Sequence, residues 1–159
     1  MSNLLPTSLA YALLHAATAS AAVFNGQSLA ENLLTKVDPL ARPAVQDLLY
    51  NSLRRYGWGD FILTQLMERP LDVPEIRALL LVALARLEAR PDATHTTVDQ
   101  AVLAAGELLE GRLRGLVNAV LRNYLRRRDA LAQAIAGNEV ATHQHPGWWL
   151  EALRAAWPD

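Results

Sequence analysis

The chain contains no cysteine. This excludes a disulfide framework, a thiolate metal site and any reaction that needs a cysteine nucleophile. Charged residues make up only 19% of the chain and hydrophobic residues 52%, so intrinsic disorder is not expected. No run of 18 or more apolar residues is present, which argues against a membrane span. The amino-terminal segment lacks the basic start of a signal peptide, and we expect a cytoplasmic protein.

Strand signals are also scarce. β-branched residues are few and no segment alternates apolar and polar residues with a period of two, whereas alanine and leucine dominate. The composition therefore predicts an all-α fold. A chain of 159 residues fits one domain with a sizeable core. We expect residues 1–136 to form a helical domain and residues 137–159 to be a linker and the start of a further segment.

Proline, glycine and capping residues divide the chain into about seven or eight helices. Asp38-Pro39 is expected to open a helix that Gly57 and Gly59 end, with aspartate as its cap. Thr94 or Thr96 should cap a later one. The expected helices span residues 8–22, 28–34, 39–56, 60–68, 75–89, 94–109 and 113–136, followed by a short helix after residue 147. The centre of 75–89 is apolar all round, which is typical of a buried axis.

The stretch 112–128, RLRGLVNAVLRNYLRRR, combines two patterns on one expected helix. An apolar stripe with a period of 3.6 residues consists of Leu113, Leu116, Val117, Val120, Leu121, Tyr124 and Leu125. Six arginines and no carboxylate occupy the same stretch. Arg112, Arg122 and Arg126 should lie opposite the stripe, with small residues between them. This arrangement predicts contact with RNA phosphates, although a merely solvated polar face gives the same pattern.

The candidate RNA-binding residues are Arg112, Arg114, Arg122 and Arg126, together with a smaller cluster, Arg54 and Arg55. Because the net charge is only −1, any such site must be a local patch. Fourteen of the fifteen basic residues are arginine. That bias suits phosphate contacts, and a GC-rich genome would produce it equally well.

Nothing in the sequence indicates catalysis or a metal. His143 and His145 have no Cys, Asp or Glu at ligand spacing, and no glycine-rich phosphate loop or nucleophile motif is present. We therefore expect no catalytic residue, no metal site and no cofactor in this chain. Three of the four tryptophans, Trp148, Trp149 and Trp157, gather near the carboxyl end. They are expected either to fold back on the bundle or to dock a further domain.

Several segments together resemble the NusB/RsmB family. They are GLVNAVLR at 115–122, ATHTTVDQAV at 93–102, VQDLLYNSLRR at 45–55 and HPGWWLEALRAAWP at 145–158. The last segment and the string NAVLR resemble the S-adenosylmethionine-dependent rRNA methyltransferases of the family. The resemblance implies a NusB-like bundle in two helical subdomains. It also implies that a methyltransferase domain, absent here, uses a cysteine and holds S-adenosylmethionine.

The resemblance implies an RNA-binding amino-terminal domain that positions 16S rRNA for 5-methylcytosine formation. Two alternatives stay open. One is a free-standing transcription antitermination factor, and the other is a protein-interaction module that docks a catalytic domain or a ribosomal protein. Gln100 departs from the family pattern, which has glutamate there, and the first helix lacks the usual arginine. If those two groups pair in relatives, their joint loss avoids a buried unpaired charge.

Overall fold

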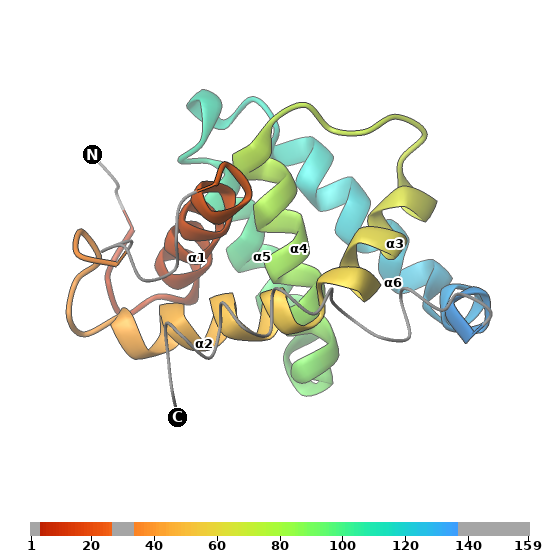
Figure 1. Ribbon diagram of the computed structural model, residues 1–159, viewed down its shortest axis with the longest axis horizontal. Coiled ribbons are helices and arrows are strands. Elements are labelled where there is room, and N and C mark those ends of the chain that lie inside the picture. Colours follow the sequence, from red (N-terminus) through yellow and green to blue (C-terminus); the bar gives the residue numbers. More distant parts are fainter. Residues whose placement is uncertain (1–3, 27–33, 137–159) are drawn as a thin grey trace.

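The computed structural model describes residues 4–26 and 34–136, and these residues form helices and connecting turns without strands (Figure 1). The all-α prediction is confirmed. The α-helices are α1 (Leu9–Phe24), α2 (Arg42–Arg54), α3 (Tyr56–Leu66), α4 (Pro74–Ala89), α5 (Thr94–Ala105) and α6 (Arg114–Ala136), with short 3₁₀ helices η1 (Pro91–Ala93) and η2 (Leu109–Gly111). The expected helix after residue 147 lies outside the described residues, and so does 28–34 except for Leu34. None of the described helices is long and apolar enough to cross a bilayer.

Helix α4 is the axis of the core, as its apolar sequence predicts. Its side chains are buried all round, and Leu79, Leu80, Val82, Ala83 and Leu84 are each 0% exposed. Helices α1, α2, α3, α5 and α6 all contact it, and Figure 1 shows it between the others. Burying the apolar surface of every other helix against one central helix is the main stabilising term of such a bundle.

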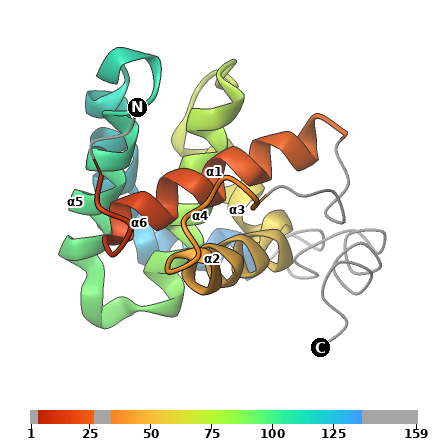
Figure 2. The ribbon, with the colours of Figure 1, turned by 90° about the vertical axis from the view of Figure 1, so that its left-hand side faces the viewer.

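The other helices form two groups around α4. Helix α1 contacts α2 and α5 on one side, while α6 contacts α3 and α5 on the other. Figure 2 shows α1 crossing the bundle in front of α4, with α2 below it. The buried side chains nevertheless form one continuous cluster. The two groups therefore share α4, α5 and one core, and the two subdomains implied by the family resemblance stay a prediction.

Helix α1 lies close to the expected span 8–22, and local signals set both of its ends. Ser8 is the amino-terminal cap, and its Oγ accepts a hydrogen bond from the Tyr11 amide at 3.1 Å. Gly26, with φ of +96°, follows the carboxyl end, where glycine adopts the left-handed conformation at low cost. The side-chain oxygen of Gln100 accepts a bond from the Ala10 amide at 3.1 Å. A neutral amide on α5 thus satisfies one free N–H group of α1 without burying a charge.

The expected start of α2 at Asp38-Pro39 is wrong. The helix begins at Arg42, with Ala41 as its cap and no side-chain cap bond. Asp38 Oδ1 instead accepts a bond from the Leu40 amide at 2.9 Å, so the aspartate closes a local turn, which is the competing use of this residue type. Leu40 lies in that turn and is 78% exposed.

The expected end of this helix at Gly57 and Gly59 is also wrong. The break falls at Arg55, and both glycines are buried inside α3. A β-carbon added at Gly59 would lie 2.9 Å from Cδ2 of Leu81. The glycine therefore permits a close approach of α3 to α4 and does not end a helix.

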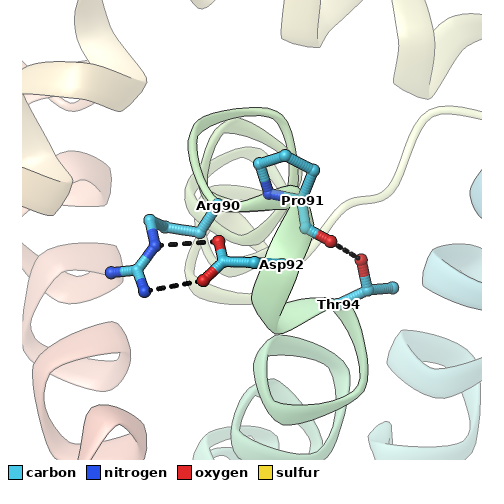
Figure 3. Close-up of polar contacts among 4 residues, drawn as sticks. All are labelled: Arg90, Pro91, Asp92 and Thr94. Carbon is cyan, nitrogen blue, oxygen red and sulfur yellow. Dashed lines mark hydrogen bonds and ion pairs between the residues drawn. The ribbon is translucent and has the colours of Figure 1, made fainter.

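The capping role expected of Thr94 or Thr96 is not observed, since α5 has Ala93 as its cap and no side-chain cap bond. Figure 3 shows the turn that precedes α5. Arg90 donates two hydrogen bonds to the Asp92 carboxylate, at 3.1 and 3.0 Å, and Thr94 Oγ1 donates to the Pro91 carbonyl at 3.0 Å. These local bonds hold the short connection between α4 and α5.

Helix α5 ends at Ala105 and not at the expected Leu109. Leu109, Glu110 and Gly111 have φ values of +50°, +57° and +74°. Left-handed backbone costs roughly 1–2 kcal/mol for an ordinary L residue, so η2 is a strained turn. It reverses the chain so that α6 can pack back against α5.

Replacing Ser8 with alanine is expected to lower the free energy of unfolding by about 1 kcal/mol, because the cap of α1 is lost. Equilibrium urea denaturation followed by circular dichroism measures this change. Ser8→Asp is the matched control, since aspartate also accepts the capping bond and should retain most of the stability. Equal losses in both variants would show that the cap bond is not the cause.

Candidate nucleic-acid interface

Helix α6 has the two faces that its sequence predicts. Val117, Val120, Leu121, Tyr124 and Leu131 are buried, while Leu113, Leu116 and Leu125 are partly buried against the same core. The arginines expected opposite this stripe lie in solvent. Packing of the apolar stripe against α3, α4 and α5 fixes the rotation of the helix, and therefore which face stays accessible.

All four arginines predicted in the stretch 112–128 are exposed: Arg114, Arg122 and Arg126 lie on α6, and Arg112 lies in the turn just before it. None of them pairs with a carboxylate among the described residues. Arg122 Nε donates to Asn118 Oδ1 at 3.0 Å, one helical turn away. This bond orients the side chain along the helix and leaves the terminal guanidinium nitrogens available to an anion.

Arg112 and Arg114 also stabilise the turn before the helix. Arg112 Nε donates to the Leu109 carbonyl at 3.1 Å, and Arg114 Nε donates to the Gly111 carbonyl at 3.3 Å. The Arg114 side chain also lies against Gly106, whose added β-carbon would be 3.3 Å from Cδ of Arg114. These two arginines therefore stabilise the strained η2 turn as well as adding positive charge to the surface.

Arg54 and Arg55, the second predicted cluster, lie in different environments. Arg54 is exposed, with its guanidinium 5.4 Å from the centre of the Tyr50 ring. Arg55 is half-buried and lies 4.6 Å from the centre of the Trp58 ring, and its Nε is buried without a hydrogen-bond partner. Arg55 therefore stacks on Trp58 at the junction of α2 and α3, which is a packing role. Only Arg54 of this pair is placed as a surface cation.

Two α6 arginines that were not singled out have defined partners. Arg128 forms an ion pair with Glu88 of α4 at 2.9 Å, and Arg127 Nη1 donates to the Gln65 carbonyl of α3 at 3.3 Å. The Glu88 carboxylate also accepts a bond from the Tyr124 hydroxyl. No sequence signal pointed to these contacts, because the partners lie on other helices.

Glu88 and Tyr124 connect α4 to α6 within the core. Tyr124 is 2% exposed and meets the Trp58 ring edge-on at a centroid distance of 6.0 Å. Burial, with a contribution from the hydrogen bond to Glu88, raises the pKa of Tyr124 far above its usual value. The tyrosine therefore stays protonated and donates to the carboxylate, and this bond holds α6 in its rotation on the bundle.

The described residues contain no group of three or more His, Asp or Glu side chains that could hold a metal ion. His143 and His145 lie outside the described residues, as do the predicted docking residues Trp148, Trp149 and Trp157. The docking of a further domain through these tryptophans stays a prediction.

A helical bundle around one buried helix, with a row of exposed arginines on its last described helix, defines an all-α domain with one basic face. The chain belongs to the NusB family, whose model matches residues 8–126. The predicted kinship is therefore confirmed.

The chain is also similar to proteins named ribosomal RNA small subunit methyltransferase B. The one from Pseudomonas putida is 35% identical over 152 residues, covering 92% of this chain and 35% of that protein. The one from Vibrio cholerae is 33% identical over 126 residues, covering 78% of this chain and 29% of that protein. The one from Escherichia coli (strain CFT073) is 30% identical over 142 residues, covering 86% of this chain and 33% of that protein. The chain thus spans about a third of the length of these curated relatives.

Replacing Tyr124 with phenylalanine is expected to lower the free energy of unfolding by about 2 kcal/mol, because Glu88 loses a hydrogen bond in a partly buried site. Urea denaturation measures the change. Arg122→Gln serves as the control on the exposed face of the same helix and should change stability by less than about 0.5 kcal/mol. A Tyr124→Phe variant as stable as the parent would contradict the proposed link between α4 and α6.

Proposed function

We propose that this chain is an RNA-binding domain that positions ribosomal RNA for a methyltransferase. The observation that carries the proposal is a set of exposed guanidinium groups without a carboxylate partner among the described residues: Arg122 and Arg126 on the outer face of α6, Arg114 at its start and Arg112 in the turn before it. Arginine forks suit phosphate oxygens. Phosphate contacts fix the register of a nucleic acid without reading its sequence, which is what positioning requires.

The relatives support the choice of RNA. The proteins compared above are ribosomal RNA methyltransferases by name, which favours this role over that of a free-standing antitermination factor. Within 112–128 the sequence holds no acidic residue that would repel the phosphate backbone. Arg54 is exposed and is proposed as a further phosphate contact, whereas Arg55 stacks on Trp58. We place this role in the cytoplasm, where ribosomal RNA is modified.

The chemical step is assigned to a part of the enzyme other than the described residues. S-adenosylmethionine does not fit them, because they contain no strand and so no α/β crevice of the kind that holds such a cofactor. The chain also has no cysteine to attack a cytosine ring. In this proposal the bundle supplies binding energy and orientation, and Trp148, Trp149 and Trp157 dock the catalytic domain.

Reversing two charges tests the proposal. Arg122→Glu and Arg126→Glu should each weaken binding of a short fragment of 16S rRNA about tenfold at low salt, since each removes a cation and adds a repulsive carboxylate. Fluorescence anisotropy at several salt concentrations measures the affinity and its salt slope. The slope should become shallower in both variants, because fewer counterions are released.

Arg90→Glu is the matched control. It makes the same change of net charge at an exposed arginine that Asp92 already pairs (Figure 3), so the affinity should change little. An equal loss in the control would indicate a non-specific effect of net charge. Absence of RNA binding at low salt, or binding that salt does not affect, would contradict the proposal.

A further inference from the structure

A shallow groove of about 500 Å³ runs beside the row of arginines on α6. It was not foreseen from the sequence, because its two walls are more than forty residues apart in the chain. One wall is the end of α3 and the segment after it, Leu66–Arg69, and the other is α6, with Leu116, Ala119, Val120 and Asn123. The volume falls in the range of small-molecule sites, roughly 300–1,000 Å³.

The floor of this groove, which we call the α3–α6 groove, is apolar. Leu66, Met67 and Leu116 are partly buried, Val120 is 6% exposed, and Ala119, which has a small side chain, also lines the groove. Asn123 adds one side-chain amide, which offers both a donor and an acceptor. Such a groove suits a flat group with apolar faces and polar edges.

The lining of the groove contains one cation and one carboxylate, and further arginines of α6 lie near it. Arg69 lines the groove and is exposed. Arg126 follows Asn123 by three residues and Ala119 by seven, so it lies on the same face of α6. Arg127 reaches from α6 to the Gln65 carbonyl of α3 at 3.3 Å, beside the end of the groove. Glu68 is the one carboxylate among the lining residues. Nearby guanidinium groups beside a largely apolar lining favour a ligand that combines anionic groups with a flat apolar one.

We propose that the α3–α6 groove binds an unpaired base of single-stranded RNA, while Arg69, Arg126 and Arg127 contact the flanking phosphates. This inference rests on the proposed function. It adds that the bound RNA is single-stranded, and it adds the groove residues, Arg69 and Arg127 to the binding surface. Bases of a duplex are stacked and paired and cannot enter such a groove, whereas bases of single strands can be splayed out onto apolar or guanidinium surfaces. The contact with the base should contribute binding free energy that depends little on salt. The contacts with phosphates contribute binding free energy that salt weakens.

Two RNA probes of equal length test the inference with the full chain: a short single-stranded oligonucleotide and the same strand with abasic sugars. The parent protein should bind the first about tenfold more tightly, since a stacked base contributes roughly this much. Ala119→Trp should abolish that preference by filling the groove. Its affinity for the abasic strand, and the salt dependence of that affinity, should remain. Ala132→Trp is the control, because Ala132 is exposed on the same helix outside the groove.

Two milder variants test the groove even if the tryptophan disturbs the helix. Asn123→Leu should lower the preference about threefold by removing the amide, and Glu68→Gln should tighten binding of both probes by removing a repulsive charge. Equal affinity of the parent for both probes, or a preference that survives Ala119→Trp, would overturn the groove assignment while leaving the phosphate-binding role standing. Failure to bind either probe at low salt would overturn both proposals.

Discussion

The packing of α6 on the bundle is the constraint on which the candidate surface depends. Val117 and Leu121 are 0% exposed, and Tyr124 donates to Glu88 of the central helix. A helix held by an apolar seam and one buried hydrogen bond cannot rotate without exposing the seam, at a cost of about 25 cal/mol per Å² of apolar surface. The position of every arginine on the outer face follows from that seam.

The α6 arginines show how one residue type takes different roles within two helical turns. Arg128 pairs with Glu88 and Arg127 donates to a backbone carbonyl of α3, so both are partly committed to holding helices together. Arg122 and Arg126 face away from the bundle and have no carboxylate partner among the described residues. The unpaired cations therefore add the greater part of the local positive potential.

Much of the fold could be predicted because the deciding interactions are local. The all-round apolar centre of α4, the apolar period of α6, the Ser8 cap and the Gly26 stop act over a few residues, and all four are observed. The errors share a cause as well. Asp38 and Gly59 each have a second use, in a local turn and in a close helix contact, and only the tertiary structure decides between the uses. The end of α5 was missed because two non-glycine residues adopt left-handed backbone.

The candidate site was predictable to the extent that it lies on one helix. A period of 3.6 residues places Arg122 and Arg126 together without knowledge of any partner, and the structure keeps them exposed. Arg112, expected on the same face, is exposed too but lies before the first residue of α6. Arg55 shows the limit of this reasoning, because its stacking on Trp58 depends on where the α2–α3 break falls. The α3–α6 groove could not be predicted from helical periodicity, because its walls meet only when α6 packs against α3. A phosphate-binding row can thus be inferred from periodicity, whereas a base-binding groove requires the assembled bundle.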